Sequence, residues 1–118
     1  MKAININDEE TPFTNLILDG MKTVETREKP TLRSLVGQRV GIIRTGCGKA
    51  KLVGYVDIVA EIMYSTYTQF TFDYLRHRVR PYSKYDMRGC VKWGYILKNP
   101  ERCEPIEVDA KGIVIRNI

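Results

Sequence analysis

Two long segments rich in β-branched residues, 39–44 and 52–62, are joined by a glycine-containing turn at 45–48. Valine and isoleucine favour strands, and a short glycine-rich stretch between two strands is typical of a reversal. A hairpin is the simplest connection between such neighbours, so we predict that the two segments pair antiparallel. Gly54, near the start of the second segment, is a candidate β-bulge.

Further extended segments are predicted on both sides of this hairpin, from alternating or continuous apolar residues. One of them begins at Trp93, which we interpret as a core residue, and a turn is predicted after it at 98–102. The additional strands cover residues 2–7, 22–27, 93–97 and 112–115, with a short extended piece at 106–108.

Two or three short helical segments are also predicted. The first extends from Pro12 to Gly20, because a Thr-Pro pair favours the start of a helix and glycine favours its end. Residues 31–36 are expected to form a single turn. The last helix, which Pro81 stops, has Thr68 or Thr71 as its cap and runs through Phe72, Leu75 and Val79.

These elements indicate an α+β fold, namely a small, mostly antiparallel β-barrel or curved sheet of five to six strands with two to three short covering helices. A length of 118 residues, 43% of them hydrophobic, suits one domain over residues 1–118 with its own core. A doubly wound parallel sheet is not expected, because the chain lacks the repeated strand–helix alternation that parallel crossovers require.

The net charge of +5 indicates anionic partners, and the basic residues are concentrated in one segment. Tyrosines alternate with cations between residues 74 and 92, which is typical of single-stranded nucleic acid binding. The alternative is a solvated basic face whose tyrosines pack inward. The cations are Arg76, Arg78, Arg80, Lys84, Arg88 and Lys92, opposed only by Asp86.

Cysteine and histidine usage argues against a metal or disulfide framework. The three cysteines are widely spaced and form no C-x-x-C pair, and His77 is the single histidine, so neither a metal nor another cofactor is expected. We interpret His77, which lies between two arginines, as a surface or backbone-contacting residue. Because the sequence shows neither a signal peptide nor an apolar run of about 20 residues, we expect a cytoplasmic protein without membrane association.

A cluster of charged residues, Gly20-x-Lys22-x-x-Glu25-x-Arg27, follows the first predicted helix. Side chains alternate between the two faces of a strand, so Thr23, Glu25 and Arg27 would share one face. Lys22, close to the flexible Gly20, could reach either face. Such a set of side chains can orient a ligand, and it can equally form an ordinary surface ion pair.

The Gly-x-Lys-x-x-Glu-x-Arg motif, with Pro12-Phe13 before it, resembles the signature of the ASCH domain family, small β-barrels of the wider PUA-like superfamily. The resemblance extends over nearly the whole chain and includes residues 54–58, 93–97, 105–106 and 112–114. It implies a cleft beside the barrel that is lined by the motif, is covered by the variable middle segment, and holds RNA or a nucleobase-like ligand. Some members of the family are enzymes, which hydrolyse acylated cytidine nucleosides or cleave RNA.

In such a cleft, Lys22 would contact a phosphate or base carbonyl, Arg27 would bind an oxyanion or stack on a ring, and Glu25 would accept an exocyclic amino group. The candidate catalytic residues are Lys22 and Glu25. The candidate residues for binding the ligand or nucleic acid are Lys22, Thr23, Glu25, Arg27, Arg76, Arg78, Arg80, Lys84 and Arg88.

RNA or a nucleotide-like small molecule is therefore the expected partner, and two alternatives remain. One is a hydrolase, an amidohydrolase or a ribonuclease, with Glu25 as acid or base. The deacylating branch of the family has a nucleophilic Thr three residues after its Lys, where this chain has Glu25. The other alternative is a protein-interaction module in which the Glu25–Arg27 pair braces the barrel.

Overall fold

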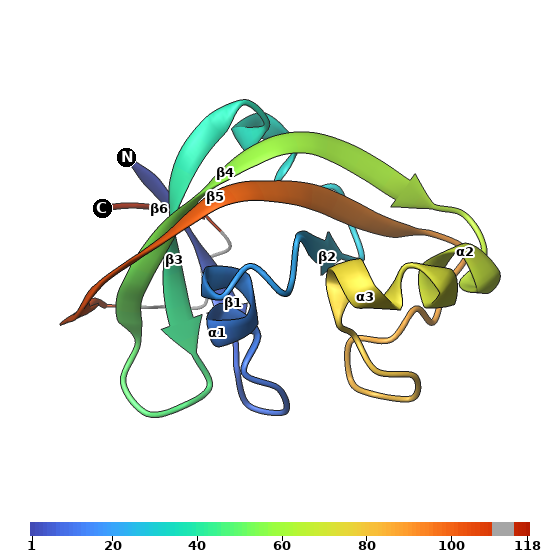
Figure 1. Ribbon diagram of the computed structural model, residues 1–118, viewed down its shortest axis with the longest axis horizontal. Coiled ribbons are helices and arrows are strands. Elements are labelled where there is room, and N and C mark those ends of the chain that lie inside the picture. Colours follow the sequence, from blue (N-terminus) through green and yellow to red (C-terminus); the bar gives the residue numbers. More distant parts are fainter. Residues whose placement is uncertain (110–114) are drawn as a thin grey trace.

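The computed structural model describes residues 1–109 and 115–118 and contains one curled six-stranded sheet, in the order β2-β5-β4-β3-β1-β6 (Figure 1). The predicted strand at 112–115 lies mostly outside the described residues. The strands are β1 (Lys2–Asn7), β2 (Val24–Arg27), β3 (Gln38–Thr45), β4 (Lys51–Tyr64), β5 (Lys92–Glu107) and β6 (Ile115–Asn117). The helices are α1 (Phe13–Leu18), the 3-10 turn η1 (Arg33–Leu35), α2 (Tyr67–Phe72) and α3 (Tyr74–His77).

The predicted hairpin is confirmed, since β3 and β4 pair antiparallel along most of β3. The register of β4 also shifts against both of its neighbours close to Gly54, as expected of a bulge. A Cβ atom at Gly54 would lie only 2.4 Å from the carbonyl oxygen of Glu101 and 2.5 Å from Leu18. Glycine is therefore required here for the close approach of β5 and α1 to β4.

The turn predicted at 98–102 is wrong. The predicted strand 93–97 and the extended piece 106–108 belong largely to one strand, β5, which pairs with β4 over most of its length. Asn99 has a positive φ of 54°, and the register shifts at the position opposite residues 99 and 100. The Asn-Pro pair therefore forms a bulge and not a turn. The strand continues through it because β5 pairs with β4 on both sides of the bulge.

The third helix also differs from its prediction. Residues 67–77 form two short helices that meet at Asp73, and Thr66 caps the first by accepting a hydrogen bond from the Gln69 amide. Because of this break, Phe72 and Leu75 are 86% and 69% exposed, while other residues of the segment face the core. The prediction assumed one continuous helix, so it did not separate the exposed residues of the segment from the buried ones.

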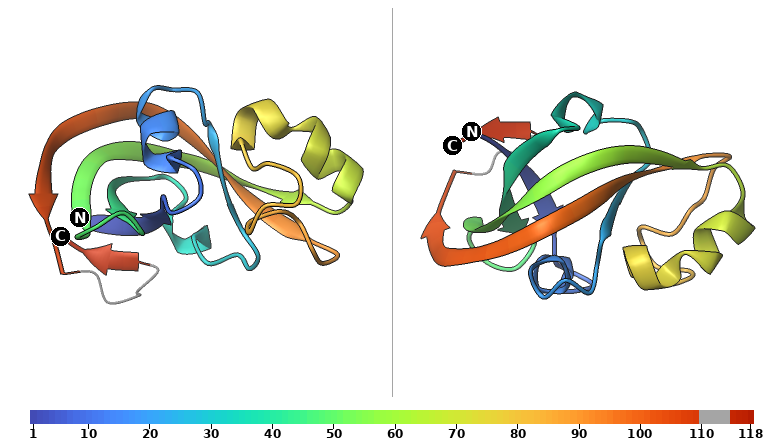
Figure 2. Two further views of the ribbon diagram at one scale, coloured as in Figure 1. Left: turned by 90° about the horizontal axis from the view of Figure 1, so that it is seen from below. Right: turned by 45° about the horizontal axis from the view of Figure 1, so that its top comes forward.

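The sheet is mostly antiparallel, but β1 pairs parallel with β3. Strand β2 pairs with β5 alone, so the sheet leaves an open seam where β1 and β2 approach each other. The concave side holds the main core, against which Trp93 packs as predicted. Helices α2 and α3 lie at one end of the sheet, opposite the chain termini (Figure 2).

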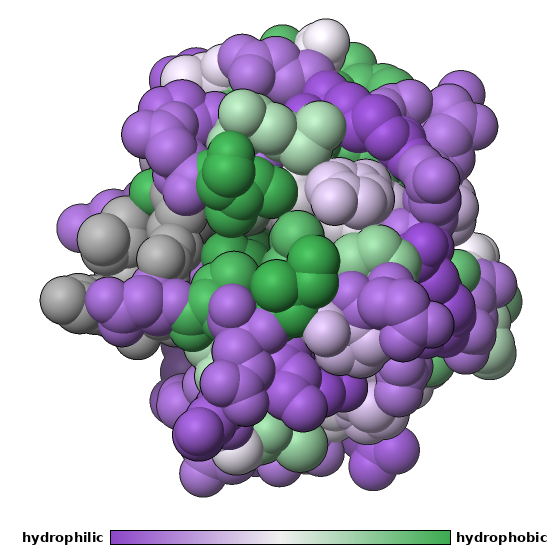
Figure 3. Space-filling view, turned by 90° about the vertical axis from the view of Figure 1, so that its left-hand side faces the viewer, coloured by the Kyte–Doolittle hydropathy of each residue, from purple (hydrophilic) through white to green (hydrophobic). Residues whose placement is uncertain are grey.

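The face of the molecule seen in Figure 3 is largely polar and includes an apolar patch near its centre. Among the described residues, no helix is long and apolar enough to cross a membrane. The same part of the chain contains no group of three or more His, Cys, Asp or Glu residues able to hold a metal ion. All three cysteines are unpaired.

Candidate ligand-binding site

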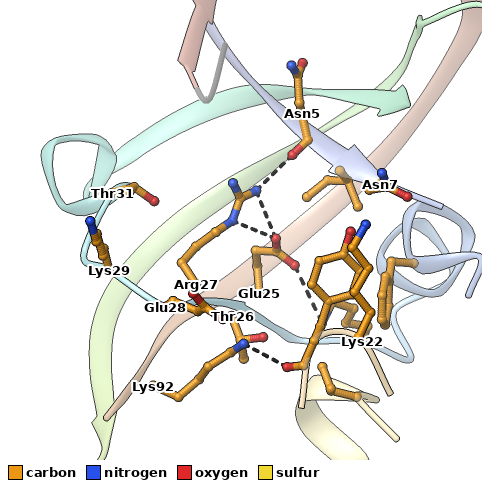
Figure 4. Close-up of a pocket in the computed structure, with 15 residues that line it drawn as sticks. Asn5, Asn7, Lys22, Glu25, Thr26, Arg27, Glu28, Lys29, Thr31 and Lys92 are labelled. Atoms are coloured by element: carbon orange, nitrogen blue, oxygen red, sulfur yellow. Dashed lines mark hydrogen bonds and ion pairs between the residues drawn. The ribbon is translucent and has the colours of Figure 1, made fainter. Parts of the chain in front are cut away.

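A pocket of about 470 Å³ lies at the seam between β1 and β2 (Figure 4). One wall comes from residues 5–7 of β1 and another from residues 25–27 of β2. The loop after α3 contributes Lys84 and Tyr85, and the first residue of β5 contributes Lys92. The charged motif and the basic middle segment, far apart in the sequence, therefore meet at one site.

Lys22 lies at the inner end of this pocket and is only 2% exposed. Its Nζ donates a hydrogen bond to the backbone carbonyl of His77, lies 3.6 Å from Glu25 Oε1, and sits 4.7 Å from the ring centre of Phe13. The expectation that Lys22 could reach either face is thus wrong, because these contacts hold its ammonium inside the pocket. Burial lowers the pKa of Lys22 to about 8, against the opposing effect of Glu25.

Glu25 and Arg27 form an ion pair within the pocket wall, with Arg27 Nη2 2.9 Å and Nε 3.0 Å from Glu25 Oε2. Arg27 Nη2 also donates to the backbone carbonyl of Asn5, at 2.9 Å. This contact connects β2 to β1 where the sheet has no backbone pairing. The pair therefore lines the site and braces the barrel at the same time, because one guanidinium serves both contacts.

Lys92 is the second buried lysine of the pocket, also 2% exposed. Its Nζ donates to the carbonyl oxygen of Tyr85 at 2.8 Å, and burial lowers its pKa. Sequence reasoning placed Lys92 in the basic segment without choosing it for the site. The signal that could have found it is strand register, because Trp93 pairs with Arg27 and Lys92 directly precedes it.

Other pocket residues were also missed, because nothing in their local sequence distinguishes them from ordinary surface or core residues. Phe13 and Tyr85 contribute aromatic rings, which pack edge to face with centres 6.1 Å apart. Lys84 Nζ lies 5.5 Å from the ring centre of Tyr85. The remaining lining residues with polar side chains that sequence reasoning did not select are Asn5, Asn7, Thr26, Glu28, Lys29 and Thr31.

Several predicted binding residues do not line the pocket. Thr23 is not among the lining residues, and its backbone is hydrogen-bonded to Arg76 and Leu97. Arg76 forms an ion pair with Asp73 at 2.7 Å. Arg78, Arg80 and Arg88 lie outside the pocket. Arg78 donates to the backbone carbonyls of Leu75 and Met21, and Arg88 donates to that of Ser83.

His77 is fully buried, so the prediction of a surface residue is wrong. Its ring does contact the backbone, as the alternative interpretation expected. Its Nδ1 accepts a hydrogen bond from the Val79 amide at 2.9 Å, so Nε2 carries the proton and donates to the Phe70 carbonyl at 2.6 Å. The ring also stacks on Phe70, with centres 4.0 Å apart. Burial lowers the pKa of His77 to about 4, so the imidazole is neutral at physiological pH.

The curled sheet, its short helices and the seam pocket define a small α+β protein. Residues 10–107 match the model of the ASCH domain, and the chain belongs to the ASCH domain family. The sequence-based expectations of fold class and family are therefore confirmed.

Solved structures agree with this assignment. The chain is similar to a mutant form of the ASCH protein from Zymomonas mobilis, with a TM-score of 0.78 and 19% identity over 99% of this chain and 87% of that one. A second structure, of the ASCH protein from the same organism, gives a TM-score of 0.71 and 19% identity over 91% of this chain and 73% of that one. At these identities the similarity establishes the fold alone. A search of curated proteins found no match.

Proposed function

We propose that this protein binds a nucleotide or a short stretch of single-stranded RNA in the seam pocket. The observation that carries the proposal is the charge of the lining, where five basic side chains face two carboxylates. Such a lining attracts an anionic ligand, and phosphate contacts supply most of the affinity of nucleic acid binding. The basic side chains are Lys22, Arg27, Lys29, Lys84 and Lys92, and the carboxylates are Glu25 and Glu28.

The uncharged part of the lining suits a nucleobase. The partly buried ring of Tyr85 offers a surface for stacking, and the buried ring of Phe13 adds apolar surface to the wall. The amide and hydroxyl groups of the lining supply donors and acceptors for a base edge. Glu25 offers an acceptor for an exocyclic amino group. A volume of about 470 Å³ falls within the usual range for small-ligand pockets.

Binding of a labelled mixed-sequence RNA tetranucleotide at low and moderate salt, followed by fluorescence anisotropy, tests the proposal. Affinity should fall steeply with salt. It should also fall several-fold in Lys84→Ala, because Lys84 lines the pocket and is exposed, so its loss leaves the fold intact. The matched control is Lys98→Ala, an exposed lysine of β5 outside the pocket. Equal losses in both variants, or no binding at low salt, would contradict the proposal.

Hydrolysis of a modified nucleoside or of RNA is the second candidate function. It is favoured by one observation, the buried Lys22 with a pKa of about 8, 3.6 Å from a Glu25 carboxylate oxygen. An amine that titrates this close to neutral pH can act as a general acid or base. Incubation with N4-acylated cytidine and with RNA, with and without divalent metal, tests it, and turnover that survives Glu25→Gln would exclude Glu25 from the chemistry.

We further infer a cytoplasmic location, supported by three cysteines that are all unpaired. Fractionation of cells that express the tagged protein tests this part of the proposal.

A further inference from the structure

The pocket buries more positive charge than negative charge. Lys22 and Lys92 are each 2% exposed, and the side chain of Arg27 is 18% exposed. The one buried carboxylate of the lining is Glu25, which is 8% exposed. Three cations therefore share one carboxylate in a region of reduced solvent access.

The contacts of Glu25 leave the two lysines poorly neutralised. Its Oε2 atom is held by Arg27 at 2.9 Å, while Lys22 lies at the longer distance of 3.6 Å from Oε1. Lys92 forms no ion pair within 4.0 Å among the described residues, and its hydrogen bond goes to the neutral carbonyl of Tyr85. A buried cation without a close anion is costly, because water no longer solvates it.

Two other carboxylates attract Lys92 only from longer range. Glu28 is exposed to solvent, which screens it. Asp86 is buried but lies outside the pocket lining, and its Oδ2 accepts hydrogen bonds from the Tyr67 hydroxyl and the Tyr82 amide. Neither of them supplies the charge that the inner part of the pocket lacks.

We infer that the ligand of this pocket carries a terminal phosphomonoester, which lies against Lys22 and Lys92. The inference rests on the proposed function and narrows its ligand class. A terminal monoester carries close to two negative charges and three free oxygens, whereas a phosphodiester within a strand carries one charge. The monoester thus matches an excess of two buried cations, and its oxygens can accept from both ammonium groups together.

A purely structural role for the lysines leads to different expectations. Each Nζ also donates to a backbone carbonyl, Lys22 to that of His77 at the end of α3 and Lys92 to that of Tyr85 in the loop that follows. Lys92→Gln removes the charge and keeps an N–H donor for the Tyr85 carbonyl. If Lys92 only braces this segment, the variant alters the melting temperature and leaves ligand preference unchanged.

The experiment compares three forms of one RNA tetranucleotide, with a 5′-phosphate, a 3′-phosphate or hydroxyls at both ends, by isothermal titration at fixed salt. We expect one phosphorylated form to bind about tenfold tighter than the hydroxyl form, the effect of one charge-assisted hydrogen bond. The preferred form identifies which end enters the pocket. The preference for the phosphorylated form over the hydroxyl form should fall below about threefold in Lys92→Gln. It should persist in the control variant Lys98→Gln, which removes one positive charge from β5 outside the pocket.

Equal binding of the three forms to the unmodified protein would overturn the phosphomonoester inference and leave the proposed function standing. A preference that persists in Lys92→Gln would remove Lys92 from phosphate recognition and overturn the inference in this form. Failure of all three forms to bind would contradict the proposed function itself. Equal binding of the three forms to the unmodified protein would overturn the inference even if Lys92→Gln does not fold.

Discussion

The buried ammonium of Lys22 is bound to the backbone carbonyl of His77, 55 residues further along the chain. This contact fixes the family motif to the end of α3, and the loop that follows α3 contributes Lys84 and Tyr85 to the pocket lining. The side chain of His77 is in turn fixed by hydrogen bonds to Phe70 and Val79. The inner wall of the site is therefore stabilised by backbone contacts as well as by charge.

Because Lys22 is buried, the free energy of unfolding should rise with pH above about pH 8. The pKa of Lys22 is about 8 in the folded protein and near 10.5 in the unfolded chain, so the unfolded chain binds the extra proton between these values. The destabilisation by Lys22 is complete below about pH 8 and is relieved as the pH rises through that window.

Lys22→Met should lack this gain. Above pH 8, the unfolding free energy of the unmodified protein should rise relative to that of the variant by up to about 1.4 kcal/mol per pH unit. Urea denaturation at a series of pH values measures it. Parallel curves would show that Lys22 does not titrate in this range.

The single histidine should remain neutral well below its ordinary pKa. Its folded-state pKa is about 4 against an ordinary value of 6.5, so only the unfolded chain takes up a proton as the pH falls between these values. Its contribution to stability is thus lost as the pH falls from about 6.5 to about 4. NMR of the ring nitrogens should show one signal set with Nε2 protonated and no titration near pH 6.5, whereas the protein unfolded in urea supplies the ordinary titration.

Removal of the guanidinium that connects β2 to β1 should weaken the fold. Arg27→Gln loses the ion pair to Glu25 and the contact with the Asn5 carbonyl, leaving a partly buried carboxylate with its more distant cation. We expect a loss of about 1–3 kcal/mol in urea denaturation. Arg102→Gln, which breaks an exposed ion pair to Asp19, is the control and should cost no more than about 1 kcal/mol.

A methyl group at Gly54 should be poorly tolerated. In Gly54→Ala the new Cβ would meet the backbone of β5 and the side chain of Leu18, and a backbone atom cannot move aside cheaply. We expect a loss of about 1–3 kcal/mol in unfolding free energy. Gly89→Ala, where nothing lies within 4 Å of the new Cβ, should be nearly neutral. Equal stability of the two variants would contradict the close packing at the bulge.

Much of the fold could be predicted from local pattern. The β3–β4 hairpin, the bulge near Gly54 and the strand that carries Glu25 and Arg27 all follow from propensity, alternation and turn residues. The turn at 98–102 was wrong, because pairing with β4 keeps the chain extended through Asn99 and Pro100. Turn residues in the sequence do not show that pairing with a neighbouring strand can keep the same residues extended.

The sequence by itself determined that Glu25 and Arg27 lie on one face of a strand, because side chains alternate between the two faces. Only the tertiary structure decided that Lys22 is buried, and which cations of the basic segment reach the pocket. Lys84 and Lys92 line it, while the arginines of that segment lie outside. The physical reason is that burial and long-range pairing depend on how the sheet curls and where the loop after α3 returns, and neither leaves a local periodic signal.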